Sequence, residues 1–378
     1  MGKRLALHLV MAGFLAISGC DVLKKPSASS TPAAENTEIP YRLEIFAKDL
    51  NVPWAIDIAK DGRVFLTERP GTIRVMTKGQ LLQEPVLSLE APFASQGEGG
   101  LLGLALDPHF TANHYIYVYH TYEENGEMKN RVLRTVEHNN KATIDKVLID
   151  NIPGSTNHNG GRIKFGPDGY LYITAGDKYD PPLAQSKDSL GGKILRIRAD
   201  GSIPENNPFP GSPVYSLGHR NPQGLAWQSE TGKLFSSEHG QSAHDEFNVI
   251  EAGANYGWPL IEGDETADGM KPPIVQSGET TWAPSGITFV TQGQWKGNLL
   301  MANLRGSQVL RFVIGEHNGQ PRISEVIPLF AGQLGRIRDV YEGPDGSIYV
   351  MTNNRDGRGK PRLHDDQIIR LVPTGAER

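Results

Sequence analysis

The stretch that decides the fold is Asn157 to Asp177, NHNGGRIKFGPDGYLYITAGD. It opens on polar and glycine residues and continues with alternating apolar and polar residues, as in a half-buried strand. Pro167-Asp168-Gly169 is typical of a tight turn, and Leu171 to Thr174 return as a second apolar strand. Both ends of a hairpin lie at the same end of a sheet, so we expect His158 to lie near Asp177.

An imidazole that a carboxylate orients is a general-base arrangement. The stretch therefore predicts a catalytic pair, His158 and Asp177, at one rim of a sheet. A second interpretation of these residues alone stays open, in which the two side chains only satisfy the backbone of a capped hairpin.

The same pattern recurs along the chain. Each copy has a small or polar opening, a short apolar strand, a turn and a second apolar strand. The five further copies are Asn51–Val75, Gly99–Tyr119, Asn221–Gly240, Ala283–Asn303 and Arg338–Asn353. The interval of about 50 to 60 residues is that of a propeller blade. We predict an all-β domain over residues 39–374, a six-bladed β-propeller of four-stranded antiparallel blades. A β-sandwich is the alternative, but it does not explain six similar units.

Composition agrees with an all-β chain. The 378 residues include 43 glycines and 26 prolines, which suits a turn-rich β-protein. The formal net charge of -5 and the lack of a basic stripe argue against a nucleic-acid partner.

The N-terminus has the features of an export signal. Lys3 and Arg4 precede a short apolar segment, Leu5 to Leu15, and Ile17-Ser18-Gly19-Cys20 resembles a bacterial lipobox. We therefore predict a lipoprotein-type signal peptide over residues 1–20. An ordinary signal peptide with an incidental cysteine is the alternative.

Residues 21–38 are polar and rich in Ser, Pro and Ala, and they predict a flexible tether. The expected location is periplasmic, with the only membrane attachment through a lipid on Cys20. Cys20 is the single cysteine, so the chain forms no internal disulfide.

Propeller geometry predicts one shared site. The inner strand of each blade begins at one face near the axis, and the next strand returns to that face. The residues expected there are Glu98, Asn157-His158, Arg220-Asn221, Thr281, Arg336, Arg338, Asp177, His239-Gly240 and Arg305. So many charged groups around one funnel indicate function, and the arginines imply an anionic ligand such as a polycarboxylate or phosphate.

The chain resembles the soluble quinoprotein glucose and aldose sugar dehydrogenases, which bind pyrroloquinoline quinone (PQQ) on a six-bladed propeller. The resemblance covers about Pro40 to Val372. Within the family, the chain is most similar to the bacterial aldose sugar dehydrogenase branch. The motifs are GEGGLLGLALDPHF, NHNGGRIKFGPDGYLYITAGD, GHRNPQGLAW, SSEHG with DEFNVIEAGANYGWP, TWAPSGI, and GRIRDVYEGPDG.

The resemblance implies a role for each matching position. His158 is similar to the base that removes the sugar hydroxyl proton, and Asp177 is similar to the carboxylate that orients this base. Arg220 and Asn221 resemble the pair of residues that binds the quinone oxygens of PQQ. The residues that resemble PQQ carboxylate binders are Thr281, Arg305, Arg336 and Arg338. The carbonyls of Gly240 and Gln241 resemble ligands of a catalytic calcium ion. Glu246 and the backbone of Tyr256 resemble a second, structural calcium site.

Three cofactor-contacting positions depart from the family pattern. Glu98 and His239 stand where glutamine is common, and Arg305 replaces a lysine and keeps its charge. Glu98 places a negative charge near an anionic quinone, which opposes PQQ binding unless an arginine or calcium faces it.

The implied activity is a PQQ- and calcium-dependent dehydrogenase that oxidises aldose sugars at the anomeric carbon to lactones. Hydride passes to the quinone, His158 acts as general base, and an external acceptor takes the electrons. One alternative is a calcium-dependent lactonase-type hydrolase, in which Glu98, Asn157 and Asp177 would serve an axial metal. Another is a non-catalytic propeller that binds a partner. The preferred sugar does not follow from the sequence.

Overall fold

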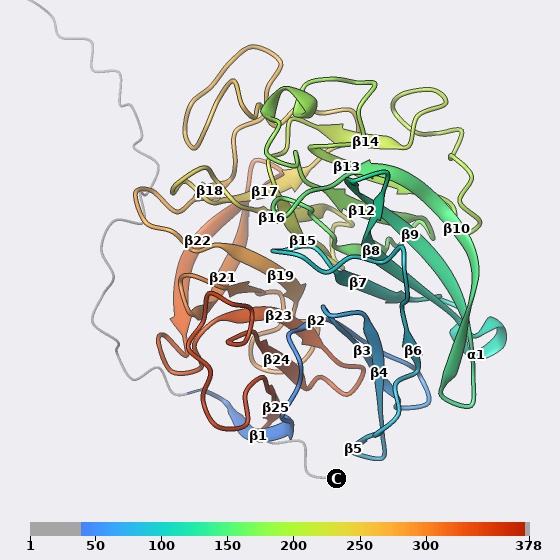
Figure 1. Cartoon of the computed structure of the whole chain (residues 1–378). Coiled ribbons are helices and arrows are strands. Elements are labelled where there is room, and N and C mark those ends of the chain that lie inside the picture. The colour runs from blue at the N-terminus through green and yellow to red at the C-terminus, as the bar shows by residue number, and fades with distance from the viewer. Residues whose placement is uncertain (1–38, 375–378) are drawn as a thin grey trace, which may run out of the picture.

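Six separate antiparallel sheets surround a common centre in the computed structural model, which describes residues 39–374 (Figure 1). The innermost strands lie near the middle, and outer strands such as β10, β14 and β22 lie at the periphery. The predicted six-bladed propeller is confirmed. The expected signal peptide (1–20) and tether (21–38) fall outside the described residues.

The first three blades follow one another along the chain, and each begins with its innermost strand. They are β2 (Pro53–Ile58), β3 (Val64–Glu68), β4 (Thr72–Thr77), β5 (Gln80–Leu81) and β6 (Leu87–Ser88); β7 (Leu101–Leu106), β8 (Tyr115–Glu124), β9 (Glu127–His138) and β10 (Lys141–Pro153); and β11 (Ile163–Phe165), β12 (Leu171–Ala175), β13 (Lys193–Ile197) and β14 (Val214–Leu217).

The remaining blades repeat the arrangement, and the last one borrows a strand from the start of the domain. They are β15 (Pro222–Trp227), β16 (Leu234–Glu238), β17 (Glu246–Ile250) and β18 (Val275–Gln276); β19 (Pro284–Phe289), β20 (Leu299–Asn303), β21 (Gln308–His317) and β22 (Gln320–Leu329); and β23 (Ile337–Glu342), β24 (Ile348–Thr352), β25 (Ile368–Pro373) and β1 (Tyr41–Ala47). Strand β1 pairs with β25, with Leu43 opposite Leu371, and this closes the ring.

A register irregularity recurs near the beginning of the innermost strands. It interrupts the first hairpin of five blades, between Pro53 and Ile56, Leu101 and Leu104, Pro222 and Gly224, Pro284 and Ile287, and Ile337 and Asp339. A bulge bends its strand and re-aims the neighbouring side chains. The residues at these strand openings therefore leave the sheet ladder and become available to a site on the axis.

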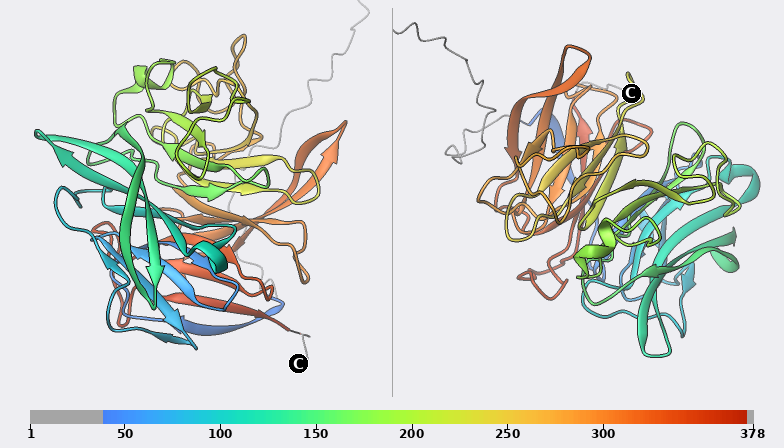
Figure 2. Two further views of the ribbon diagram at one scale, coloured as in Figure 1. Left: turned by 90° about the vertical axis from the view of Figure 1, so that its right-hand side faces the viewer. Right: turned by 90° about the horizontal axis from the view of Figure 1, so that it is seen from above.

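Apolar strands buried on both faces hold the blades together. Tyr117, Tyr119 and Phe65 are fully buried in a cluster that joins the first three blades. The outer hairpins are longer, and Figure 2 shows β9–β10 and β21–β22 standing out from the body. Among residues 39–374 the helices are α1 (Phe110–Asn113) and the 3-10 turn η1 (Pro181–Ala184), and no helix there is long and apolar enough to cross a membrane.

Candidate active site

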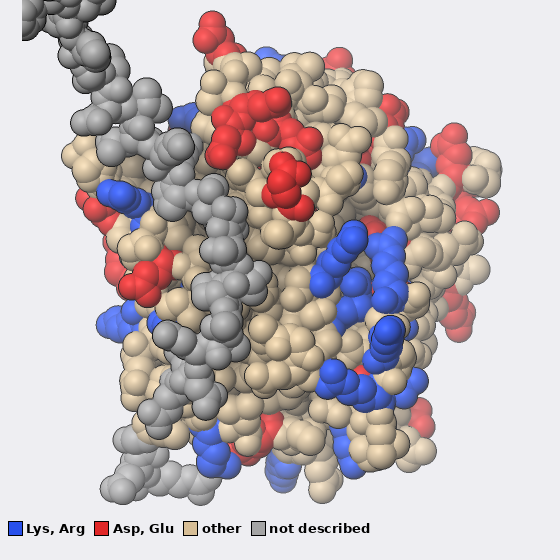
Figure 3. Space-filling model, turned by 90° about the vertical axis from the view of Figure 1, so that its left-hand side faces the viewer, with Lys and Arg blue, Asp and Glu red and all other residues tan. Residues whose placement is uncertain are grey.

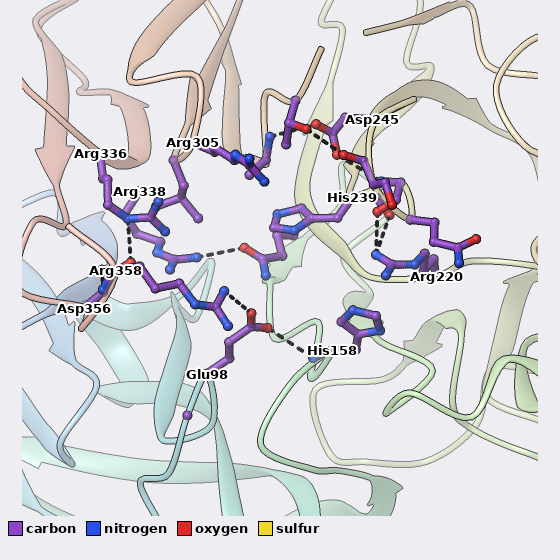
Figure 4. A pocket seen from close by; sticks show the side chains of 18 of the residues that line it. Glu98, His158, Arg220, His239, Asp245, Arg305, Arg336, Arg338, Asp356 and Arg358 are labelled. Carbon is purple, nitrogen blue, oxygen red and sulfur yellow. Dashed lines mark hydrogen bonds and ion pairs between the residues drawn. The ribbon is translucent and has the colours of Figure 1, made fainter. Parts of the chain in front are cut away.

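A cavity of about 750 Å³ opens where the inner strands begin. Its lining includes nearly every residue expected there from the sequence, and Figure 4 shows their side chains facing one space. These residues are Glu98, His158, Arg220, His239, Gly240, Gln241, Thr281, Arg305, Arg336 and Arg338. The predicted residues that do not line the cavity are Asn157, Asp177, Asn221, Glu246 and Tyr256.

His158 and Asp177 form a buried pair. Nδ1 of His158 lies 2.7 Å from Oδ1 of Asp177, and the side chains are 7% and 1% exposed. A carboxylate only accepts, so Nδ1 carries the proton and Nε2 is left as the acceptor. Burial alone would raise the pKa of Asp177. Hydrogen bonds from His158, the Tyr179 amide and the Trp258 indole hold that pKa below its usual value instead.

Backbone geometry explains why the pair forms at this point of the chain. Gly176 ends the hairpin, and a Cβ there would lie 2.1 Å from the carbonyl oxygen of His158. Only glycine allows that approach. His158 itself has a left-handed backbone with φ 54°, and its amide donates to Glu98 (Oε2, 3.1 Å).

The lining carries more positive than negative charge. It contains the six arginines Arg69, Arg220, Arg305, Arg336, Arg338 and Arg358, against the three carboxylates Glu98, Asp245 and Asp356. Within the part of the chain that the structure describes, three buried nitrogens here lack a partner: Arg220 Nε, Asn221 Nδ2 and His239 Nε2. The nitrogens of Arg220 and Asn221 are donors, and unpaired donors together with excess cations are the features that a polyanion with several acceptor oxygens would satisfy. The residues therefore fit PQQ.

Two of the arginines differ in how they are held. Arg336 is paired, with 2.7 Å between its Nε and Oδ2 of Asp356. Arg338 is 5% exposed and donates to the amide oxygens of Gln223 (2.8 Å) and Asn353 (3.1 Å), and burial lowers its pKa to about 9. A buried guanidinium with only neutral acceptors is a cation that an incoming carboxylate would stabilise.

Arg220 lies against the Gly240 carbonyl, which the family resemblance assigned to calcium. Its NH1 donates to Gly240 O at 2.6 Å. The neighbouring Asn221 is fully buried, and its Oδ1 accepts from the Gly160 amide at 3.0 Å. A cation at Gly240 O would share that oxygen with the Arg220 guanidinium or displace it.

The predicted catalytic calcium site depends on backbone oxygens. Gly240 and Gln241 both line the cavity, and carbonyl oxygens suit a hard cation such as calcium. Over residues 39–374 no three His, Cys, Asp or Glu side chains are placed to share one ion. The calcium assignment of Gly240 and Gln241 stays a prediction.

The second predicted calcium site lies beside the β16–β17 ladder. Glu246 stands opposite Glu238, and burial together with the charge of Glu238 raises the pKa of Glu246 to about 8. Tyr256 lies in the same region, because its ring stacks on His219, which pairs with Glu238. Two close carboxylates would be stabilised by a cation, so this pair fits the predicted site.

Glu98, one of the three positions that depart from the family pattern, faces an arginine. Its Oε1 lies 2.6 Å from NH1 of Arg358, whose NH2 donates to Oδ1 of Asn157 at 3.0 Å. The side chains of Asp177, Asn157 and Glu98 are thus each engaged by protein groups. The axial metal of a lactonase-type hydrolase would have to compete with these contacts, and that alternative does not explain the arginines of the lining.

Sequence reasoning missed several lining residues, five of which carry charged or amide side chains. Arg69, Asp356 and Arg358 follow the second strands of their repeats, β3 and β24, and the rule that found Asp177 and Arg305 would have found them. Gln223 lies within β15 and Asp245 just before β17. Both fall inside the motifs GHRNPQGLAW and DEFNVIEAGANYGWP, but the strand-end rule singled out neither of them.

Surface charge is also segregated. On the face seen in Figure 3, basic side chains gather in one patch, and acidic side chains form a separate group above it. The modest net charge of -5 conceals this grouping. Local excess of one sign raises the concentration of oppositely charged ligands.

Fold and cavity together define a β-propeller with an arginine-rich cavity and a histidine that a buried carboxylate orients. A model of the family "Glucose / Sorbosone dehydrogenase" matches residues 50–369, and the chain belongs to that family. The resemblance stated from the motifs is confirmed.

Similar proteins and solved structures support the same family assignment. Aldose sugar dehydrogenase YliI of Escherichia coli is 32% identical over 83% of this chain and 91% of its own length. A PQQ-bound aldose sugar dehydrogenase of Streptomyces coelicolor is 36% identical, with a TM-score of 0.79 over 88% of this chain and 98% of that one. A putative oxidoreductase (glucose dehydrogenase) of Thermus thermophilus is 43% identical, with a TM-score of 0.82 over 88% and 100%.

Proposed function

We propose that this protein is a PQQ-dependent dehydrogenase that oxidises aldose sugars at the anomeric carbon to lactones. One observation carries the proposal: an imidazole held by a buried carboxylate faces a cavity with an excess of arginines. Membership of the glucose/sorbosone dehydrogenase family supports it.

His158 is the group that removes the sugar hydroxyl proton. Its Nδ1 is held by Asp177, which leaves Nε2 as a proton acceptor at the cavity wall. Asp177 stabilises the imidazolium that forms, and its own low pKa keeps it ionised. PQQ, when bound, supplies the carbon that accepts the hydride.

The arginines bind and orient the cofactor. Arg336, Arg338 and Arg305 would hold its carboxylates, with Thr281 as a neutral partner, and Arg220 with Asn221 would hold the quinone oxygens. Positive charge fixed beside those oxygens stabilises negative charge that develops there. Calcium held by the carbonyls of Gly240 and Gln241 would also stabilise this negative charge.

Reconstitution tests the proposal. Purified protein is stripped with chelator and mixed with PQQ alone, calcium alone, or both, and reduction of an artificial dye is followed with a panel of aldoses. Activity is expected only with both additions, and it should be abolished again by chelator. Full aldose oxidation with a nicotinamide cofactor and no PQQ would refute the proposal. The panel also identifies the preferred sugar.

The location proposed for the protein is the periplasm, with a lipid anchor at Cys20. The sequence of basic, apolar and lipobox residues in Lys3 to Cys20 supports it. Mass spectrometry of the mature N-terminus from the native bacterial host tests it, since an unmodified chain that retains Met1 is incompatible with it. We further propose that the electrons leave to an external acceptor of the quinone, dye or cytochrome type.

A further inference from the structure

Tyr179 covers the proposed base. Its ring lies parallel to the imidazole of His158, with 3.9 Å between centroids and 14° between planes. Tyr179 also lines the cavity, although the residue is 63% exposed. One face of the imidazole is therefore closed by an aromatic ring at the entrance to the site.

The backbone of Tyr179 is tied to the carboxylate that orients His158. The amide of Tyr179 donates to Oδ1 of Asp177 at 2.9 Å, the same oxygen that lies 2.7 Å from His158 Nδ1. Oδ2 of Asp177 accepts from the Trp258 indole at 2.9 Å. In addition, the amide of Lys178 donates to the carbonyl of His158 at 3.3 Å. In the segment Asp177–Tyr179, the carboxylate of Asp177 thus contacts the edge of the imidazole, and the ring of Tyr179 covers one face of it.

This placement has an energetic cost. Lys178 and Tyr179 both have left-handed backbones, with φ 51° and 69°, a region that bulky residues rarely adopt. Because the residue is 63% exposed, Tyr179 buries little surface, and hydrophobic packing does not offset the cost. Strain that stability does not explain is typical of functional positions.

The rest of the loop is built to be rigid. Pro181 and Pro182 begin the turn η1. The ammonium of Lys193, which is fully buried, donates to the carbonyls of Leu183 (2.7 Å) and Gly191 (2.7 Å). A pre-organised loop holds the Tyr179 ring in one position without an ordering step when ligand binds.

We propose that Tyr179 is a positioning residue for His158: its stacked ring fixes the plane of the imidazole, so that Nε2 faces the substrate. The role of His158 as base belongs to the proposed function, and this inference rests on it. Aromatic stacking favours one ring orientation by a factor of roughly 3 to 10, and loss of the ring should reduce turnover by about that factor.

The test compares Tyr179→Phe with Tyr179→Leu. Tyr179→Phe keeps the ring and should retain kcat to within about twofold, whereas Tyr179→Leu should lower kcat roughly 3- to 10-fold with little change in PQQ affinity. Tyr170→Leu is the matched control, because Tyr170 lies in the turn at the other end of the same hairpin. It should leave kcat unchanged.

A spectroscopic measurement keeps the inference separate from the proposed function. In the protein without cofactor, the carbon-bound ring protons of His158 should show an upfield ring-current shift by NMR. That shift should persist in Tyr179→Phe and vanish in Tyr179→Leu. No shift in the wild-type protein, equal kcat losses in both variants, or unchanged kcat in Tyr179→Leu would overturn the inference. If the wild-type protein shows the shift but oxidises no aldose, the proposed function fails and the stacked arrangement stands without a catalytic role.

Discussion

Arg358 neutralises Glu98 across 260 residues of chain, with 2.6 Å between NH1 and Oε1. Glu98 is the residue whose charge opposed PQQ binding in the sequence argument. Burial alone would raise the pKa of Glu98. His239, Arg358 and the His158 amide hold that pKa below its usual value, so the carboxylate stays ionised. An ionised Glu98 is compatible with an anionic cofactor because the guanidinium of Arg358 offsets it.

Removing Arg358 should therefore weaken PQQ binding. Arg358→Gln leaves the Glu98 carboxylate uncompensated, and we expect the Kd for PQQ to rise roughly 3- to 10-fold, as for one partly screened charge. The double variant Glu98→Gln/Arg358→Gln should return to within about twofold of the wild type. Fluorescence titration of the protein with PQQ measures both. Lys360→Gln, which removes an exposed charge from the same loop, is the control, and an equal loss there would mean that the pairing has no specific effect.

Arg336 should act on the cofactor rather than on the reaction. It lines the cavity and is oriented by Asp356, so Arg336→Ala removes a charge-assisted hydrogen bond to a PQQ carboxylate. Such bonds correspond to a loss of affinity of roughly 10- to 100-fold. Turnover at saturating PQQ should recover to within a few-fold of the wild type. Persistently low kcat at saturation would instead place Arg336 in the reacting geometry.

Stability should fall in mild acid because of His120, which is fully buried. Its Nε2 accepts from Arg131 (2.9 Å) and its Nδ1 contacts Thr121 O (2.9 Å), and burial lowers its pKa to about 4. The unfolded chain takes up this proton near pH 6.5, whereas the folded chain does so near 4. Between these values the unfolded state binds more protons, so stability is full above about pH 6.5 and is lost as pH falls.

The loss should reach on the order of 3 kcal/mol by pH 4 for this one group. Urea unfolding at pH 7, 5.5 and 4.5 measures it. His120→Asn should be less stable than the wild type at pH 7 but should show a flatter dependence on pH. His109→Asn, at a side chain that is 83% exposed, is the control and should keep the wild-type slope. An unchanged slope in His120→Asn would exclude His120 as the source.

The fold was predictable because its determinants are local. Alternating strands, turns and their repetition can be read from neighbouring residues, and the closure of β1 on β25 follows from the strand count. Once the propeller is known, the strand ends must meet at one face. This geometry predicted that His158 lies beside Asp177, and that His158 and Arg338 line the same cavity.

The rest of the site depends on contacts between distant segments. Arg358 reaches Glu98 from a loop whose course depends on its own packing, and no spacing in the sequence encodes that contact. The bulges at the strand openings and the stack of Tyr179 on His158 depend likewise on backbone geometry that several residues adopt together. The hydrogen bond from Arg220 to the Gly240 carbonyl was also unforeseen, because the sequence argument gave the two residues different partners.

The strongest expectation concerns His158 and Asp177. If His158 is the base, His158→Ala should reduce kcat by roughly 100- to 10,000-fold, the usual contribution of a positioned proton acceptor. PQQ affinity should change much less, because the arginines supply most of the binding. Asp177→Asn should fall between the wild type and His158→Ala, since an amide can still hold the ring but cannot stabilise the imidazolium.

Asp168→Asn makes the same chemical change in the turn at the far end of this hairpin, where Asp168 accepts from Tyr172 at 2.8 Å. It should therefore leave kcat close to that of the wild type, which separates loss of the base from a general weakening of the blade. Steady-state kinetics at saturating PQQ and a PQQ titration of each variant distinguish the two effects. If His158→Ala keeps near-normal turnover while its fold and PQQ affinity are intact, the buried imidazole is a structural partner of Asp177, and the proton must leave the sugar by another route.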